Sequence, residues 1–303
     1  MVANQREHTA LLVDPETRQE LAKVTVGVNG HEVAVSPDSR FAYVPIYGNS
    51  GVGKPGTDGA TIDVIDLHDR KLTATIDLGK PLRPHRAEFG PDGLLYVTAE
   101  LAKAVDVIDP ATRKVIAEIP TGAIESHMIV ISPSGKRAYT ANVAAGSVSV
   151  LDLEQRSLVT VIPVAKTVQR ISISPDGKRF FTHDQDTPRI AVIDTTTNNV
   201  ASWISLPSTV YSSLPTADGR KLLASSPSGK IFVIDLANAK LDESFDIPAA
   251  LGELLLTPDG KFAFVSCPQA GTIEVLDVRG HKLLQPIKLT QGVDGLAWAS
   301  AIP

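Results

Sequence analysis

The sequence of 303 residues has little cysteine and few aromatic residues, and both shortages limit what the protein can be. Its one cysteine, Cys267, excludes an internal disulfide and leaves the redox compartment open. Phe, Trp and Tyr together make up 5% of the residues, which gives little support to a broad aromatic surface for a protein partner. No apolar run reaches the roughly 18 residues that a membrane span needs, so no membrane partner is expected.

Clustered positive charge is also missing. The chain has 29 Lys and Arg against 34 Asp and Glu, for a net charge of -5, and the basic residues are scattered. A phosphate-binding surface needs a concentrated basic face, so no nucleic-acid partner is expected. The first residues, M-V-A-N-Q-R-E-H-T, lack the apolar segment of a secretory signal, and the sequence leaves the native compartment open.

No window of the sequence has the apolar spacing of an amphipathic helix, so helices are not expected. The sequence has a repeat instead. The segment H-E-V-A-V-S-P-D at 31–38 recurs in varied form, and its aspartate position falls at residues 38, 92, 134, 176, 218 and 259. The steps are 54, 42, 42, 42 and 41 residues. A period near forty-two indicates a repeat architecture, so residues 1–303 are predicted to form a single domain.

Each repeat contains four short runs with the pattern of β-strands. Several runs are aliphatic on both faces, as in strands that are covered on both sides. Seven repeats of four antiparallel strands predict an all-β, seven-bladed β-propeller. The strand-like run 293–299 has no successor, whereas residues 1–26 supply three strands. We therefore predict that the two termini complete one blade and close the ring.

The repeat resembles the YVTN-type β-propeller repeat, including YncE-like and surface-layer-like propellers. The resemblance lies in phrases such as S-P-D-S-R-F-A-Y-V at 36–44, S-P-S-G-K-R-A-Y-T-A-N at 132–142 and T-P-D-G-K-F-A-F-V at 257–265, and it covers essentially the whole chain. It implies a seven-bladed propeller, commonly in bacterial or archaeal proteins. It does not imply one activity, because relatives include binding proteins, surface-layer modules, lactonase-like enzymes and redox-associated proteins.

The first repeat is twelve residues longer than the others, and the excess lies at 48–59, G-N-S-G-V-G-K-P-G-T-D-G. This insertion contains G-x-x-x-x-G-K, but Pro55 stands where a P-loop needs Ser or Thr, and a strand follows where a helix is required. We predict a hairpin loop and no nucleotide site. The insertion is expected on the same face as His31, where it is placed to act as a lid.

The residue seven positions before each turn aspartate begins the innermost strand of its blade, so these residues are expected to converge at the mouth of a central channel. Four consecutive blades contribute Asp294, His31, His85 and His127, and the other three contribute Gln169, Tyr211 and Gly252. Three imidazoles and a carboxylate suit a divalent metal ion, which the sequence does not distinguish among Zn, Mn, Fe, Cu and Mg. Binding of an anion or polar ligand by the same histidines, and a purely structural role, are the alternatives.

Other candidates for the chemistry lie near these ring positions. Glu32 and Glu125 are predicted acid–base residues, Arg86 a partner for a substrate carboxylate, and Tyr211 a donor to a developing oxyanion. Glu100, Glu253, Arg83, Arg170 and the pair His183–Asp184 are further candidates of the same kinds. Strand phase does not decide whether His31 or Glu32 faces the channel mouth.

These observations predict a small-molecule-binding propeller, and more specifically a metal-dependent hydrolase, lyase or isomerase with its site at the channel mouth. The expected partner is a small polar or carboxylate-bearing molecule, and the chain is expected to be a monomer. The alternative is a non-catalytic propeller that binds a protein or peptide across one face. A redox protein with covalently attached haem is disfavoured because the sequence has no C-x-x-C-H motif.

Overall fold

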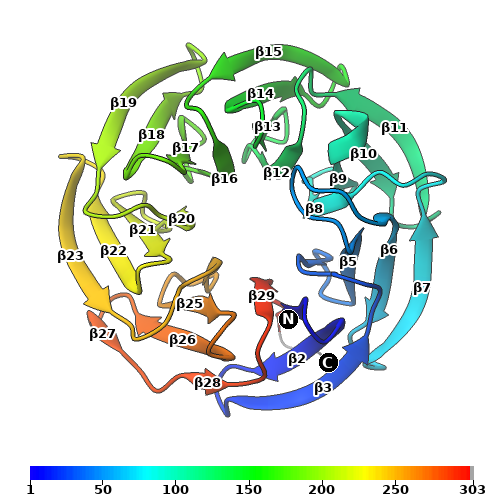
Figure 1. The fold of residues 1–303 in the computed structure, drawn as a ribbon, viewed down its shortest axis with the longest axis horizontal. Helices are drawn as coiled ribbons and strands as arrows, with labels where there is room; N and C mark the ends of the chain where they lie inside the picture. The colour runs from blue at the N-terminus through cyan, green and yellow to red at the C-terminus, as the bar shows by residue number, and fades with distance from the viewer. Residues whose placement is uncertain (301–303) are drawn as a thin grey trace.

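Seven separate antiparallel sheets surround one central axis, as Figure 1 shows. The computed structural model describes residues 1–300. Blades 1 to 3 contain β4 (Ala34–Val35), β5 (Phe41–Gly48), β6 (Asp58–Asp66) and β7 (Lys71–Asp77); β8 (Pro84–Phe89), β9 (Leu95–Ala99), β10 (Ala104–Asp109) and β11 (Lys114–Pro120); and β12 (Ser126–Ile131), β13 (Arg137–Asn142), β14 (Ser147–Asp152) and β15 (Ser157–Pro163).

The remaining blades repeat the plan. Blades 4 to 6 contain β16 (Val168–Ile173), β17 (Arg179–Asp184), β18 (Arg189–Asp194) and β19 (Asn199–Ser205); β20 (Ser212–Pro215), β21 (Lys221–Ser226), β22 (Lys230–Asp235) and β23 (Lys240–Asp246); and β24 (Leu254–Leu256), β25 (Phe262–Cys267), β26 (Thr272–Asp277), β27 (Lys282–Leu283) and β28 (Ile287–Lys288). In blade 6 the outer strand is split, since β27 and β28 both pair with β26. The structure confirms the predicted all-β, seven-bladed propeller.

Blade 7 is assembled from both ends of the chain, as β29 (Val293–Leu296), β1 (Val2–Asn4), β2 (Thr9–Asp14) and β3 (Gln19–Thr25). Val2 is paired with Leu296 and Asn4 with Val293. The amino group of Met1 donates to the Ala297 carbonyl at 2.7 Å, and the Ala297 amide donates back to Met1 at 3.0 Å. The ring is therefore closed by hydrogen bonds between the first and last strands, which removes an exposed inner edge.

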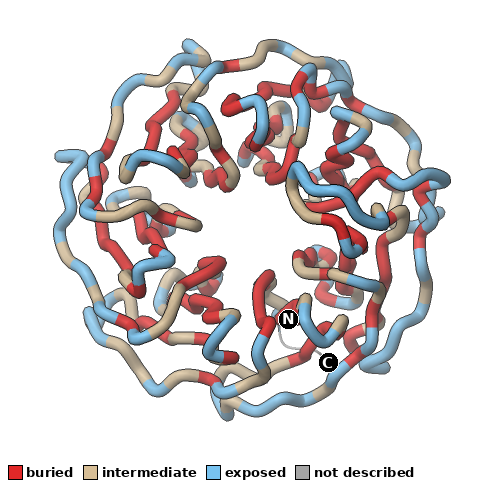
Figure 2. The backbone as a smooth tube through the Cα atoms, in the orientation of Figure 1, coloured by how far each residue is buried: buried red, intermediate tan, exposed pale blue. Residues whose placement is uncertain are grey.

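The hydrophobic core lies between neighbouring blades. Second and third strands such as β9 and β14 are buried along nearly their whole length, whereas outer strands such as β11 alternate between exposed and covered positions. Figure 2 shows this as a buried inner region inside a mostly exposed outer ring. One cluster joins Tyr139 and Val150 of blade 3 to Ile171 and Phe180 of blade 4. Sheets covered on both faces explain the aliphatic runs in the sequence.

Within the described residues, helical structure is confined to η1 (Glu100–Ala102), one turn of 3-10 helix that the sequence did not predict. Within residues 1–300, no helix is long and apolar enough to cross a membrane. The η1 turn follows β9 and brings Glu100 into the interior on the side of the ring where the innermost strands of the blades begin.

Candidate functional site

Three imidazoles form a continuous row where the innermost strands of blades 1, 2 and 3 begin. The Nε2 atom of His31 lies 2.9 Å from the Nε2 atom of His85. The ring of His85 stacks on that of His127, with centroids 3.5 Å apart. His85 and His127 are buried and His31 is partly buried. The propeller thus brings together three histidines that are 54 and 42 residues apart in sequence.

The Nδ1 atom of each imidazole faces an acceptor. His31 Nδ1 lies 3.0 Å from the Asn29 carbonyl and His85 Nδ1 lies 3.1 Å from the His127 carbonyl, while His127 Nδ1 is paired with Glu100 Oε1. A carbonyl or carboxylate oxygen can only accept, so each neutral ring must carry its hydrogen on Nδ1. The Nε2 atoms of His31 and His85 are then left with lone pairs that face each other, whereas the Nε2 atom of His127 lies 3.2 Å from the side-chain amide of Gln169.

This assignment places two lone pairs opposite each other, because the Nε2 atoms of His31 and His85 are 2.9 Å apart. Protonating one ring would relieve the repulsion, but burial lowers the pKa of His31 and lowers that of His85 well below its usual value. The neighbouring imidazoles of His127 and His31 lower the pKa of His85 further. A metal ion or a ligand N–H group between the two Nε2 atoms would remove this repulsion.

A second layer of side chains fixes His127. Glu100 is buried, and its Oε2 atom accepts a hydrogen bond of 2.7 Å from the Tyr47 hydroxyl. Burial first, and the Glu100 carboxylate second, raise the pKa of Tyr47, so this hydroxyl remains a donor. The Tyr47 ring also lies edge-on to His31 and to His85, with centroids 5.5 Å away in each case. No pattern in the sequence predicts this role, because an aromatic residue within a buried strand is usually a hydrophobic core residue.

The backbone turns sharply two residues before each of the four ring positions that were predicted as ligands. Asn29, Arg83, Glu125 and Gly292 have φ angles of 58°, 51°, 53° and 99°. Among the described residues, the equivalent positions in the other three blades, 167, 209 and 250, do not share this conformation. A left-handed residue other than glycine costs about 1–2 kcal/mol, so the surrounding contacts must hold these turns in place.

A charged cluster occupies the next position along the inner strands. Arg86 Nη1 donates to Glu32 Oε2 at 2.7 Å and to Glu253 Oε1 at 2.9 Å. Arg170 approaches the same two carboxylates at 3.0 and 3.3 Å. These four residues come from blades 1, 2, 4 and 6, so the cluster joins opposite sides of the ring across the central axis.

The two glutamates of this cluster differ in their electrostatics. Burial alone would raise the pKa of Glu32, but the guanidinium groups of Arg170 and Arg86 outweigh it and hold the pKa at about 2. Burial, followed by repulsion from Glu32, raises the pKa of Glu253 to about 7. Glu32 is therefore a permanent anion at neutral pH, whereas Glu253 can exchange a proton there.

The structure shows which groups each predicted acid–base or substrate-binding residue contacts. Glu32 and Arg86 pair with each other, so Glu32 is not a free base. The Tyr211 hydroxyl accepts from Arg170 Nη2 at 2.8 Å, which leaves its own hydrogen available. Glu125 is partly exposed beside the insertion, where a Cβ placed on Gly53 would lie 3.5 Å from its Oε1 atom.

Asp294 is not joined to the histidines in the described part of the chain. Its Oδ2 atom accepts from Gln5 at 3.3 Å, and its Oδ1 atom is buried without a partner. Burial raises its pKa to about 7, and the charges that act on it next are those of Arg170 and Glu32. Within residues 1–300, no group of three or more His, Cys, Asp or Glu side chains is arranged to hold a metal ion. The predicted four-ligand set is therefore not preformed, and metal binding by His31 and its neighbours stays a prediction.

Several buried polar atoms near the axis have no hydrogen-bond partner. They include Arg86 Nε, Arg170 Nε and Asp294 Oδ1. Buried polar groups are nearly always satisfied, so unpartnered donors and acceptors around one axis indicate water or a polar ligand. A partner for these atoms must accept hydrogen bonds from the guanidinium N–H groups and donate one to the carboxylate oxygen.

The pair His183–Asp184 lies apart from the row. His183 Nε2 is 2.8 Å from Ser213 Oγ, and Asp184 accepts from Arg189 at 3.0 Å. Burial, followed by the charge of Arg170, lowers the pKa of His183 to about 3. His183 is therefore a neutral core residue with a satisfied Nε2 atom.

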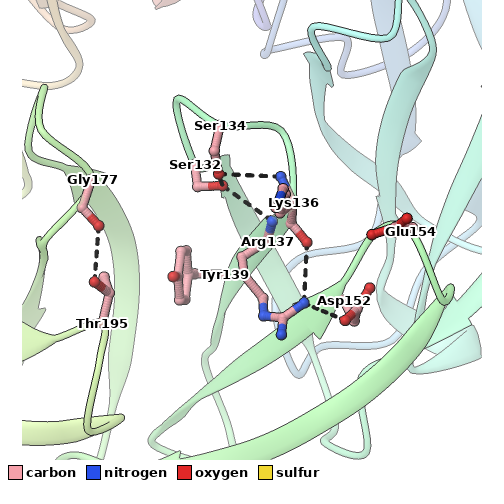
Figure 3. Close-up of a pocket in the computed structure, with 9 residues that line it drawn as sticks. All are labelled: Ser132, Ser134, Lys136, Arg137, Tyr139, Asp152, Glu154, Gly177 and Thr195. Atoms are coloured by element: carbon pink, nitrogen blue, oxygen red, sulfur yellow. Dashed lines mark hydrogen bonds and ion pairs between the residues drawn. The ribbon is translucent and has the colours of Figure 1, made fainter.

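Two surface hollows lie elsewhere. One of about 370 Å³ is lined by turn residues of blades 3 and 4, including Ser132, Arg137 and Thr195, which Figure 3 shows. The other, of about 540 Å³, lies between blades 5 and 6 and includes Asp218 and Phe245. Neither contains a residue of the histidine row or of the charged cluster.

Comparison with known proteins supports the fold more strongly than any activity. No protein-family model matches the chain, so membership of the YVTN-type family stays a prediction. The chain is 30% identical over 124 residues to a seven-bladed beta-propeller protein, Rv1057, of Mycobacterium tuberculosis; the match covers 40% of this chain and 29% of that protein. This chain therefore corresponds to less than a third of that relative's length.

Two solved structures share the architecture. Hydrazine synthase of Kuenenia stuttgartiensis superposes with a TM-score of 0.71 at 19% identity, covering 86% of this chain and 87% of that one. The dihydro-heme d1 dehydrogenase NirN in complex with DHE superposes with a TM-score of 0.70 at 15% identity, covering 97% of this chain and 73% of that one. At these identities the similarity establishes the β-propeller fold alone.

Proposed function

We propose that the protein is a metal-dependent hydrolase, lyase or isomerase that binds a small polar or carboxylate-bearing molecule at the inner end of blades 1 to 3. One observation carries the proposal: three imidazoles have Nδ1 placed on an acceptor, and the Nε2 atoms of His31 and His85 face each other at 2.9 Å. Anchoring Nδ1 on a carbonyl or carboxylate is the usual way in which proteins orient histidine ligands.

The spacing of two of the imidazoles supports a divalent transition metal as the ligand. Two ligands at about 2.1 Å from one ion, with an angle near 90° between them, are about 3 Å apart, which matches the separation of the His31 and His85 Nε2 atoms. His127, stacked on His85 and held by Glu100, would become a third ligand only by exchanging its Gln169 contact for the metal. A metal bound there would polarise a carbonyl oxygen or lower the pKa of a bound water.

The charged cluster supplies the groups that would hold and deprotonate the substrate. Arg86 and Arg170 have unpartnered N–H groups suited to a carboxylate, and the Tyr211 hydroxyl hydrogen is free to donate to a developing negative charge. Glu253 is a candidate acid–base residue because its pKa of about 7 suits proton transfer at neutral pH, although its Oε1 atom accepts from Arg86 and its Oε2 atom accepts from the Leu296 amide. Glu32 is held as an ion pair and is better suited to fixing the two arginines.

Two features of the fold bear on the choice between an enzyme and a protein-binding module. The large exposed apolar residues of the described outer strands, such as Leu72, Ile116 and Val159, number at most one to a blade, and single residues of this kind are normal on a monomer. Two structures with this architecture are enzymes by their titles, a hydrazine synthase and a dehydrogenase. Both points favour a site for a small molecule.

Metal analysis of the purified protein tests the proposal. We expect stoichiometric uptake of Zn²⁺ or Co²⁺, a Co²⁺ absorption spectrum that reports nitrogen ligands, and a loss of affinity of at least 100-fold in the His85→Ala/His127→Ala double variant. The His281→Ala variant, in which an exposed imidazole paired with Glu243 is removed, is the matched control and should keep wild-type affinity. Metal-free protein with a melting temperature unchanged by Co²⁺ or by chelation would contradict the proposal and favour the non-catalytic binding module.

A further inference from the structure

The insertion in blade 1 is fastened to blade 2 by the Arg83 side chain, and the Leu82 and Arg83 amides also donate to the Gly59 carbonyl. Arg83 Nε donates to Asp58 at 2.6 Å, Nη1 donates to the Gly51 carbonyl at 3.0 Å, and Nη2 donates to the Lys54 carbonyl at 2.8 Å. Arg83 is only 7% exposed. All three nitrogen atoms of its guanidinium group are thus used to hold the hairpin between β5 and β6, which would otherwise be a long glycine-rich loop.

Arg83 also connects the insertion to one end of the histidine row. Its guanidinium lies 5.9 Å from the centre of the Tyr47 ring, within the range of a cation–π contact. Tyr47 is the residue before Gly48, where the insertion begins, and its hydroxyl holds the Glu100 carboxylate that pairs with His127. A displacement of the insertion would therefore move the donor that orients Glu100.

The other end of the row is connected through Asn29. The side-chain amide of Asn29 donates to the Gly48 carbonyl at 3.0 Å, and the Gly48 amide donates to Val28 at 3.1 Å. The carbonyl of Asn29 is the acceptor for His31 Nδ1. The segment at the base of the insertion thus touches the residues that hold both the first and the last imidazole.

We propose that residues 48–59 form a strap, fastened by Arg83, that positions His31 and His127 for ligand binding, and that opening the strap loosens both imidazoles. Arg83 is then a positioning residue for the site described under Proposed function, on which this inference rests. On one side, hydrogen bonds join the strap to Asn29 and Asn29 to His31. On the other side, hydrogen bonds join Tyr47, the residue before the strap, to Glu100 and Glu100 to His127. The geometry extends the predicted lid into an element that shapes the site it covers.

The test compares the Arg83→Met and Asp58→Asn variants with wild type. We expect Arg83→Met to increase the rate of proteolytic cleavage within residues 48–59 at least 10-fold, to shift the imidazole ¹⁵N resonances of His31 and His127, and to weaken Co²⁺ binding about 10-fold. Asp58→Asn keeps the shape of the side chain and should give a smaller change of the same kind in all three measurements. Asp58→Asn also tests the proposal if the Arg83→Met variant does not fold.

Arg189→Met is the matched control. Arg189 pairs with Asp184 across the equivalent hairpin of blade 4 and lies 3.9 Å from the centre of the Trp203 ring. This variant should leave the ¹⁵N resonances of His31 and His127 and the affinity for Co²⁺ unchanged. The proposed role of the strap would be refuted if faster cleavage within residues 48–59 were accompanied by wild-type ¹⁵N resonances of both imidazoles. That readout needs no metal, so it separates failure of the strap from failure of the metal site.

Discussion

At the residue scale, the interior near the axis differs from an ordinary propeller core in its buried charge. Glu32 and Arg170 are almost fully buried, and Glu253 and Arg86 complete the cluster. Removing such groups from water costs several kcal/mol each, and a well-packed apolar core is often as stable. The cluster therefore contributes little net stability, and its unpartnered N–H groups are suited to water or a polar ligand.

His183 gives a residue-scale prediction about pH. Its pKa is lowered to about 3 in the folded protein by burial, so the unfolded chain binds a proton between about pH 6.5 and 3 and the folded chain does not. The associated stability is complete above pH 6.5 and falls as the pH drops, by about 2 kcal/mol at pH 5. His183→Gln should remove this part of the acid sensitivity.

Denaturant titrations at pH 7 and pH 5 measure the effect. The difference in unfolding free energy between the two pH values should be about 2 kcal/mol smaller for His183→Gln than for wild type. Ser213→Ala removes the hydrogen-bond partner but keeps the imidazole, so it should lower stability and retain the wild-type pH difference. Equal pH differences in wild type and His183→Gln would contradict this account.

At the scale of the element, the repeated turn between the first two strands of a blade shows how one residue type serves the fold. In blade 4, Asp176 Oδ1 accepts from Ser174 Oγ at 2.6 Å and from the Lys178 amide at 3.1 Å. Gly177 follows with φ of 69°, a conformation that glycine adopts without strain. The Asp carboxylate thus ties both sides of the turn together.

Blade 3 has Ser134 at this position, and Figure 3 shows this turn. Ser134 Oγ lies 3.1 Å from Ser132 Oγ and 3.4 Å from the Lys136 amide. Ser134→Asp should raise the unfolding free energy by about 1 kcal/mol, the usual worth of a restored hydrogen bond, and Asp176→Ser should lower it by a similar amount. Urea denaturation of the two variants checks the prediction, and a loss of stability in Ser134→Asp would show that the blade 3 turn differs in more than this residue.

At the scale of the whole molecule, closure of the ring is also what places His31. The Gly295 amide of β29 donates to the His31 carbonyl at 2.9 Å, and a Cβ atom at Gly295 would lie 2.3 Å from that oxygen. Only glycine allows this approach. The last strand of the chain therefore packs directly on the backbone that begins the histidine row.

Substitution of Leu296 tests how much the closing strand contributes to the free energy of unfolding. Leu296 is 3% exposed and packs in the cluster that joins blades 6 and 7, with Leu11 and Phe264. Leu296→Ala should lower the unfolding free energy by about 2–5 kcal/mol, as for other buried leucines. Leu241→Ala, on outer strand β23 where Leu241 is 37% exposed, is the matched control and should cost less than about 1 kcal/mol. Equal losses in the two variants would mean that the ring does not depend on its seam.

The sequence by itself determined the number of blades, the order of strands and the closure by both termini, because a repeat near forty-two residues and alternation along each strand are local patterns. It also identified His31, His85 and His127 as candidates, because equivalent positions in successive repeats converge at the axis. It could not show that Asp294 lies against Gln5 and not against an imidazole, because that depends on side-chain direction at the seam.

Only the tertiary structure decided what surrounds the histidines. Tyr47, Glu100 and Arg83 come from the end of a strand, a 3-10 turn and a loop, so no period in the sequence relates them. The pairing of Glu32 and Glu253 with two arginines likewise joins blades 1, 2, 4 and 6 across the axis. A repeat fixes which backbone positions converge, whereas tautomers, ion pairs and pKa shifts depend on individual side chains that the repeat leaves free to vary.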